Sequence, residues 1–63
     1  MPFKVGDRVQ CIEGTILGSI GTVMAVMLNA NGFAQFNLYE VRFDFGMRTV
    51  YGIDLALEGE TER

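Results

Sequence analysis

The sequence predicts an all-β protein that forms a small five-stranded barrel with a short 3₁₀ turn before its last strand. Runs of β-branched and aromatic residues alternate with glycines and with one Asn-Gly pair, which is typical of short strands joined by turns. No stretch places apolar residues at a sustained helical spacing. The 63 residues suffice for one domain, so we expect a single barrel over residues 1–57 and a flexible acidic tail over 58–63.

Glycines recur at short intervals in the N-terminal third of the chain. A turn at Gly6-Asp7 leads into a predicted strand from Arg8 to Ile12. The loop that follows carries glycine at positions 14, 18 and 21. Glycine accepts positive φ angles and lets neighbouring backbone approach closely, so we expect these positions to shape a corner of the barrel.

The second predicted strand, from Thr22 to about Leu28, is apolar almost throughout. Only one face of a strand in so small a barrel can be interior, so we assign Val23 and Val26 to the inside, with a bulge or bend between them. The remaining apolar residues of this strand and two nearby phenylalanines are candidates for an oligomer interface: Met24, Met27, Leu28, Phe33 and Phe36.

The region from Leu38 to Asp44 has the clearest strand pattern in the chain. From Tyr39 onward apolar and charged residues alternate, which predicts an antiparallel strand with one buried face. Tyr39, Val41 and Phe43 are expected on the buried face. Other expected features are turns at Asn29–Gly32 and Phe45-Gly46, a strand at Met47–Tyr51, a 3₁₀ turn at Ile53–Leu55 and a closing strand at Ala56–Glu58.

The composition is unusually apolar for so short a chain. Hydrophobic residues make up 49% of it and charged residues 21%, against about 25% charged residues in an average domain. The excess favours a partner surface, most simply a second copy of the chain, although a monomer with scattered surface apolar groups is the alternative. The net charge of −3 comes largely from the tail, and no clustered basic face is evident for nucleic acid.

The sequence assigns no catalytic residue, no metal site and no cofactor. Histidine is absent, and the lone Cys11 can build neither an intramolecular disulfide nor a structural zinc site. The glycines form no phosphate loop because no helix is expected after Gly21. There is no signal-peptide pattern and no run long enough to cross a membrane, so we expect a cytoplasmic protein with a buried thiol.

Two groups of residues resemble known SH3-like domains. Gly6-Asp7-Arg8-Val9, the glycines at 14, 18 and 21, and Val23 resemble a KOW motif, while residues 39–44 and Asp54-Leu55 resemble the closing strands of SH3-like barrels. The resemblance implies an SH3-like barrel that binds RNA or a partner protein. KOW modules contact RNA through basic loop residues, and the loop from Gly14 to Gly21 has none.

A second resemblance is to the plasmid-borne type II dihydrofolate reductases. It is carried by Gly6-Asp7-Arg8-Val9, by Val50-Tyr51 and by Leu57-Glu58. It implies a tetramer that holds a nucleotide or a pterin in a central pore. The functional segment of that family reads Val-Gln-Ile-Tyr, and of the segment Arg48-Thr49-Val50-Tyr51 only Tyr51 is identical.

The sequence therefore favours a non-enzymatic binding or assembly module that associates with itself or with a protein partner. A KOW-type RNA-binding module and a reductase-like tetramer are the alternatives. The residues that we expect at a ligand site are Arg48, Thr49, Tyr51 and Phe45. Aromatic side chains near strand ends commonly serve SH3-like barrels in this way, although they can instead close the ends of the barrel.

Overall fold

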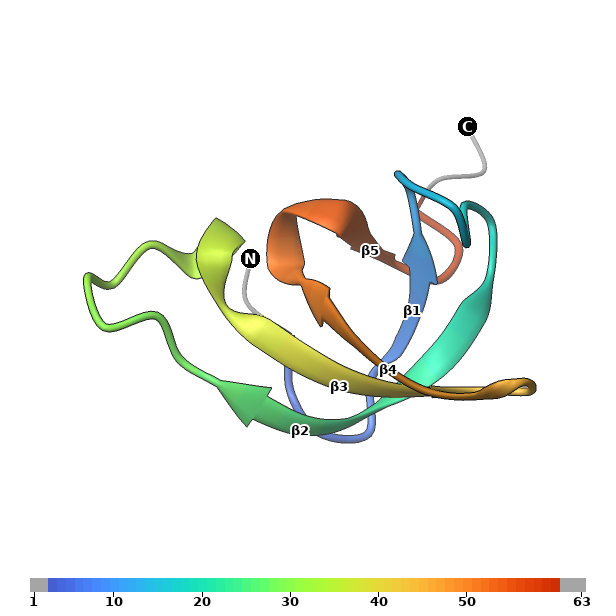
Figure 1. Cartoon of the computed structure of the whole chain (residues 1–63), viewed down its shortest axis with the longest axis horizontal. Coiled ribbons are helices and arrows are strands. Elements are labelled where there is room, and N and C mark those ends of the chain that lie inside the picture. Colours follow the sequence, from blue (N-terminus) through green and yellow to red (C-terminus); the bar gives the residue numbers. More distant parts are fainter. Residues whose placement is uncertain (1–2, 61–63) are drawn as a thin grey trace.

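The computed structural model describes residues 3–60, and residues 1–2 and 61–63 lie outside this range. The predicted all-β class with five strands is confirmed, as is the 3₁₀ turn before the last strand. Figure 1 shows the order of the elements along the chain. Their bounds are β1 Arg8–Cys11, β2 Ile20–Met27, η1 Ala34–Phe36, β3 Leu38–Phe43, β4 Gly46–Tyr51, η2 Gly52–Asp54 and β5 Leu55–Leu57.

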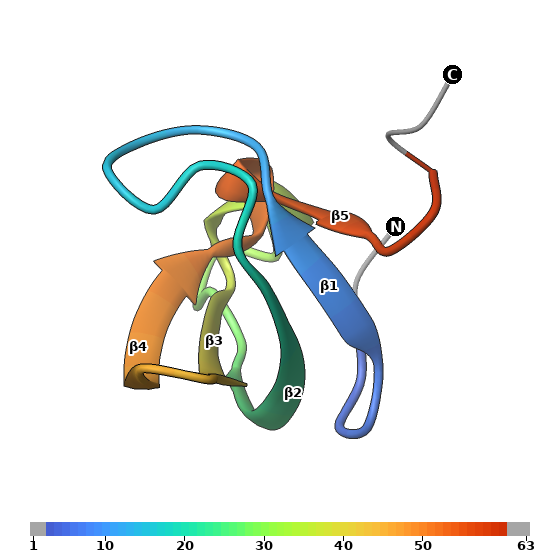
Figure 2. The same ribbon diagram turned by 90° about the vertical axis from the view of Figure 1, so that its right-hand side faces the viewer.

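The five strands form one antiparallel sheet in the order β4-β3-β2-β1-β5. Consecutive strands β1 to β4 are neighbours, and β5 returns to pair with β1. The sheet curves strongly, so that β1 and β5 lie across from β3 and β4 (Figures 1 and 2). No strand pairing joins β4 to β5 in the described part of the chain, so these two strands are the edges of an open sheet.

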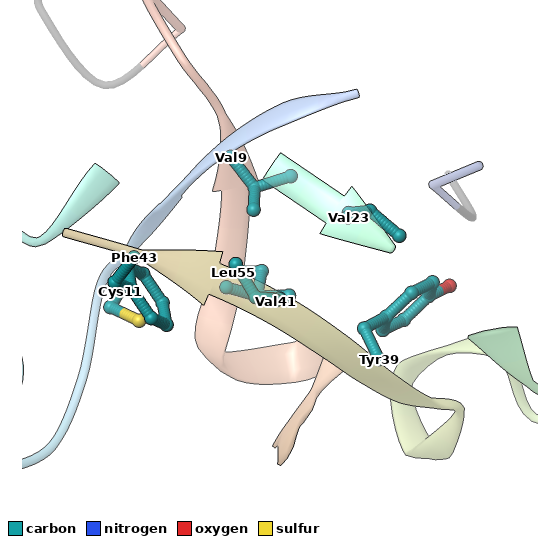
Figure 3. Packing of buried hydrophobic residues seen from close by; sticks show 7 residues of the cluster. All are labelled: Val9, Cys11, Val23, Tyr39, Val41, Phe43 and Leu55. Carbon is teal, nitrogen blue, oxygen red and sulfur yellow. The ribbon is translucent and has the colours of Figure 1, made fainter. Parts of the chain in front are cut away.

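The core lies on the concave face of this sheet, where Figure 3 shows seven side chains converging. The alternation predicted for β3 is confirmed, because Tyr39, Val41 and Phe43 are all buried. Strand β1 contributes alternate residues in the same way, as expected for a period of two. The buried hydrophobic residues are Val9, Cys11, Val23, Tyr39, Val41, Phe43 and Leu55.

Strand β2 contains the bulge that its sequence predicts. The pairing register with β3 shifts between Val23 and Ala25, so Met24 has no partner in that ladder. The extra residue lets both Val23 and Val26 face inward: Val23 is fully buried, and Val26 packs against the core. Met24 and Met27 remain on the surface, as predicted.

The three glycines of the N-terminal loop serve two different purposes. Gly14 and Gly18 have φ angles of +88° and +89°, which only glycine adopts without strain. Gly21 lies in β2, where an added Cβ would approach the carbonyl oxygen of Arg42 to 2.5 Å and Val41 Cγ1 to 2.8 Å. It therefore permits the close packing of β2 on β3.

A buried asparagine holds the long connection between β2 and β3. The Asn37 side chain accepts a hydrogen bond from the Asn29 backbone N–H at 2.8 Å and donates one to Tyr39 Oη at 3.3 Å. The Asn37 carbonyl accepts from the Gly52 N–H at 2.9 Å. Asn37 therefore ties the loop that contains η1 to β3 and to the start of η2.

Most element boundaries differ from the sequence prediction by one or two residues, and two of these shifts have a clear cause. Strand β2 begins at Ile20 because Ile20 already pairs with Gln10 of β1. Strand β5 begins at Leu55 because that residue pairs with Cys11. Long-range pairing sets both positions, and no local residue signals it.

The first residues of the predicted tail are joined to the domain. Residues 58–60 form a turn in which the Glu60 N–H donates to the Leu57 carbonyl, and Glu58 Oε1 pairs with Arg8 Nε at 3.2 Å. The rest of the predicted tail, residues 61–63, lies outside the described residues. Between residues 3 and 60, no helix is long and apolar enough to span a membrane.

Candidate functional site

The convex face of the sheet carries an apolar row across three strands. Residues paired directly across an antiparallel ladder share a face, and their side chains are in contact range. Met27 of β2 pairs with Leu38 of β3, and Leu38 pairs in turn with Tyr51 of β4. Met27 and Tyr51 are 44% and 49% exposed. We call Met27, Leu38 and Tyr51 the apolar row.

The remaining convex positions of these strands are more polar. Glu40 pairs with Thr49, and Arg42 pairs with Met47. The apolar row is therefore confined to one end of the strands, and Met47 lies on the same face nearer the β3–β4 turn.

The connection between β2 and β3 adds further apolar side chains next to this row. Leu28, which directly follows β2, is 77% exposed. The rings of Phe33 and Phe36 are also exposed and meet edge to face, with their centroids 6.5 Å apart. The hydrogen bonds of Asn37 hold this segment beside the start of β3. The interface candidates Met27, Leu28, Phe33 and Phe36 thus lie on β2 or in the connection between β2 and β3, two of the three strands that carry the row.

The four predicted ligand residues lie on different faces. Thr49 and Tyr51 are on the convex face, opposite Glu40 and Leu38. Arg48 pairs with Val41, whose side chain is buried, so Arg48 lies on the concave side at the sheet edge. The four side chains do not converge on one point of the convex surface.

Arg48 and Phe45 form a small group with Phe43. The Arg48 guanidinium lies over the Phe45 ring at 5.1 Å from its centroid, and Arg48 Nη1 donates to the Met47 carbonyl. The Phe45 ring stacks on Phe43 at 5.1 Å. These contacts occupy the aromatic face of Phe45 within the chain itself.

A cleft of about 280 Å³ lies between β4 and the loop that follows β1. Three of the predicted ligand residues, Arg48, Thr49 and Tyr51, line it. Glu13 and Asp54, which were not among the predicted ligand residues, also line it. Cys11 lies at the same cleft, and burial, followed by the nearby charge of Asp54, raises the pKa of its thiol.

A larger cavity of about 570 Å³ lies beside β5. Its wall includes Phe3, Leu55 and Leu57, together with the charged residues Lys4 and Asp7. Lys4 Nζ pairs with Asp7 Oδ1 at 3.0 Å. The Lys4 backbone N–H and then its ammonium group hydrogen-bond to Asp7 and lower the pKa of that carboxyl.

The basic side chains do not form a common patch. Lys4 and Arg8 are in ion pairs on the N-terminal side of the sheet, and Arg48 rests on an aromatic ring. Arg42 is exposed on the convex face. No group of three or more potential metal-ligating residues occurs in the range 3–60. The described basic side chains are therefore scattered rather than clustered.

The outer edge of β4 presents backbone groups that pair with no other strand, and among them the Met47 carbonyl accepts a hydrogen bond from Arg48 Nη1. Hydrogen-bonded and non-hydrogen-bonded pairs alternate along an antiparallel ladder. The bond from the Gly52 N–H to the Asn37 carbonyl marks one hydrogen-bonded position, so the pairs of Tyr39 with Val50 and of Val41 with Arg48 are hydrogen-bonded as well. The backbone groups of Arg48 and Val50 therefore point to β3. Those of Met47, Thr49 and Tyr51 point away from the sheet. In Figure 2, β4 forms one margin of the molecule, with no strand beyond it.

A scan against protein-family models finds no match for this chain, and searches among curated proteins and solved structures find none either.

Sequence reasoning missed Leu38 and Met47 as members of the convex surface. The strand alternation could have revealed Leu38, because Leu38 falls on the same face as Glu40 and Arg42, the charged residues that alternate with the buried ones. The cross-strand neighbours that turn single exposed residues into a row come only from the pairing register.

Proposed function

We propose that this protein is a non-enzymatic assembly module that associates with further copies of itself on the side of the sheet formed by β2, β3 and β4. The observation that carries the proposal is that more large hydrophobic residues lie exposed on the surface than lie buried in the core. Among residues 3–60, seven hydrophobic residues are buried, whereas twelve large hydrophobic residues are exposed. The apolar row and its neighbours gather part of this exposed set in one place, which is the usual mark of an interaction surface.

The energetics require an interface larger than the row. Burying one large apolar side chain contributes about 1.5–3 kcal/mol, whereas association costs about 4–15 kcal/mol in lost freedom. A standard interface covers about 800 Å² on each partner. The whole described surface is 4287 Å². An interface of standard size therefore has to extend beyond Met27, Leu38 and Tyr51 to the neighbouring loop or to the β4 edge.

We also propose that this open, strongly curved sheet belongs to the SH3-like barrels, with a KOW-like N-terminal segment. The return of β5 to pair with β1 supports this assignment. RNA binding and a reductase-like tetramer stay untested predictions. The scattered basic side chains favour a protein partner over nucleic acid, because nucleic-acid binding relies on clustered cations.

The proposal is tested by the molar mass in solution. We expect light scattering or sedimentation to show a concentration-dependent oligomer at about 10–100 μM, the affinity range of modest interfaces. Tyr51→Lys places a charge in the apolar row and should weaken association by about tenfold or more. Val5→Lys is the matched control, because Val5 is 61% exposed in the turn before β1. A wild-type protein that stays monomeric at about 500 μM would overturn the proposal.

A further inference from the structure

The edge of β4 lacks the features that normally prevent two sheets from joining. Natural edge strands are kept apart by lysines, prolines, bulges or very short length. Strand β4 has six residues, Gly46–Tyr51, and contains no proline, lysine or acid. Its single charge, Arg48, lies on the concave side and is held against Phe45. No other strand covers this edge, although the Met47 carbonyl accepts a hydrogen bond from Arg48 Nη1 and residues 13–16 lie across the cleft from residues 48–51.

We propose that two copies of the chain join by antiparallel pairing of their β4 strands about a twofold axis at Thr49. This inference rests on the proposed self-association and names the surface that performs it. It predicts one continuous ten-stranded sheet across the dimer, because each copy contributes five strands.

The available backbone groups limit the possible registers. Only Met47, Thr49 and Tyr51 direct their backbone groups outward, so a symmetric pairing has its axis at residue 48, 49 or 50. An axis at Arg48 sets two guanidinium groups opposite each other, which is destabilising. An axis at Val50 leaves a short overlap, because β4 ends at Tyr51 and η2 begins.

An axis at Thr49 avoids both problems. Each Thr49 exchanges its N–H and C=O with Thr49 of the second copy, and each Arg48 lies opposite Val50. On the convex face, the two Thr49 side chains are adjacent, a pair that is favourable across strands. Tyr51 then lies beside Met47 of the second copy, where sulfur and ring can make contact.

This register also lengthens the apolar surface. The row of Met27, Leu38 and Tyr51 continues onto Met47 of the second copy, and the twofold axis repeats this arrangement. In this dimer the β4 edges would form main-chain hydrogen bonds between the two copies. The apolar row would add side-chain contacts beside them. The other edge is less suited to this pairing, because β5 has only three residues.

A charge exchange at the axis tests the proposal. Thr49→Lys and Thr49→Glu each set two like charges together, so we expect each variant alone to be monomeric at concentrations where the wild type is dimeric. An equimolar mixture should form a heterodimer, observed by native mass spectrometry. Because Glu40 lies opposite Thr49 on β3, circular dichroism should verify that both variants are folded. Val5→Lys, which lies away from β4 in the strand order, should remain dimeric.

Hydrogen exchange of the wild-type protein tests the same pairing without substitution. We expect the Thr49 amide to be protected at high protein concentration and to exchange at least about tenfold faster on dilution to the monomer. The Val50 amide, which bonds to β3, should be protected at both concentrations. An oligomeric wild type whose Thr49 amide exchanges freely, or whose association is unaffected by both Thr49 variants, overturns the β4 pairing and leaves the proposed function standing. A monomeric wild type overturns both.

Discussion

The two edges of the sheet, β4 and β5, differ in length and in what surrounds them. Strand β5 has three residues and borders a cavity whose wall includes Phe3 and Lys4. The Phe3 N–H donates to Tyr39 Oη, which holds this N-terminal segment in place. Strand β4 has six residues, and its outer backbone groups face away from every other strand.

This difference indicates where the protein can form contacts with another chain. Short or flanked edges are poor templates for pairing, whereas long uncovered edges are good ones. The chain limits pairing at β5 by length and by the neighbouring N-terminal segment. At β4 no strand covers the outer backbone groups, although residues 13–16 lie across a cleft from part of this edge, and apolar side chains lie next to it. The molecule is thus asymmetric in its capacity for association, although both edges belong to one small sheet.

The strongest test of this comparison is a pair of proline substitutions in β4. Val50→Pro removes a backbone bond to β3 and disturbs a side chain that packs on the core, so we expect a loss of about 3 kcal/mol or more. Thr49→Pro removes only an outward N–H, and prolines are tolerated at such edge positions. We expect it to cost about 1 kcal/mol in the monomer. Urea unfolding at low concentration measures both, and equal losses would show that Thr49 also bonds to β3.

A second test addresses the packing of β2, the central strand of the sheet, against β3. Gly21→Ala places a methyl group against the Arg42 carbonyl and the Val41 side chain, so we expect it to destabilise the fold by about 1–3 kcal/mol. Gly18→Ala has open space and should show only the strain of its positive φ, about 1–2 kcal/mol. Urea midpoints compare the two, and a Gly21→Ala variant as stable as the wild type would contradict the close packing of β2 on β3.

A third test removes the contact that holds the segment beside β5. Tyr39→Phe deprives the Phe3 N–H and the Asn37 side-chain amide of their acceptor. We expect a loss of about 1–2 kcal/mol and faster amide exchange at Phe3. Tyr51→Phe is the control, since no hydrogen bond of that exposed hydroxyl is required by the fold, and its effect should stay within about 0.5 kcal/mol. Unchanged exchange at Phe3 would argue that other contacts hold the segment.

The smallest expected effect is a dependence on alkaline pH at the strand that pairs with β5. Burial, and then the charge of Asp54, raises the pKa of Cys11 above its ordinary value of 9.0. The thiolate therefore forms more readily in the unfolded chain, so stability is full below pH 9.0 and falls as the pH rises above it. Urea unfolding at increasing pH should show this loss for the wild type but not for Cys11→Ala. Parallel pH profiles of the two proteins would contradict the raised pKa.

Much of the fold follows from local patterns in the sequence. The alternation in residues 38–44 correctly predicts the buried face of β3, and the apolar run of β2 predicts its bulge. The candidate surface was predicted only in part. Met27 is recognisable as an exposed residue from β2 alone, but its neighbour Leu38 becomes part of a row only through the pairing of β2 with β3.

The ligand candidates illustrate the same limit. Arg48, Thr49 and Tyr51 are close in sequence, yet a period of two places Arg48 on the face opposite to the other two. The cleft beside them also draws Glu13 and Asp54 from distant segments. Adjacency along the strand therefore predicted three residues that line this cleft, but neither the face on which each side chain lies nor the two acids that join them.

By itself, the sequence determined the strand content, the buried alternation and the positions of the turns, because these depend on side-chain period and on the conformational range of glycine. Only the tertiary structure decided which strands become edges. That outcome depends on β5 pairing with β1, a contact between segments more than forty residues apart that no local pattern encodes. Because β5 occupies that side of β1, β4 is left as the long open edge, and the proposed association depends on it.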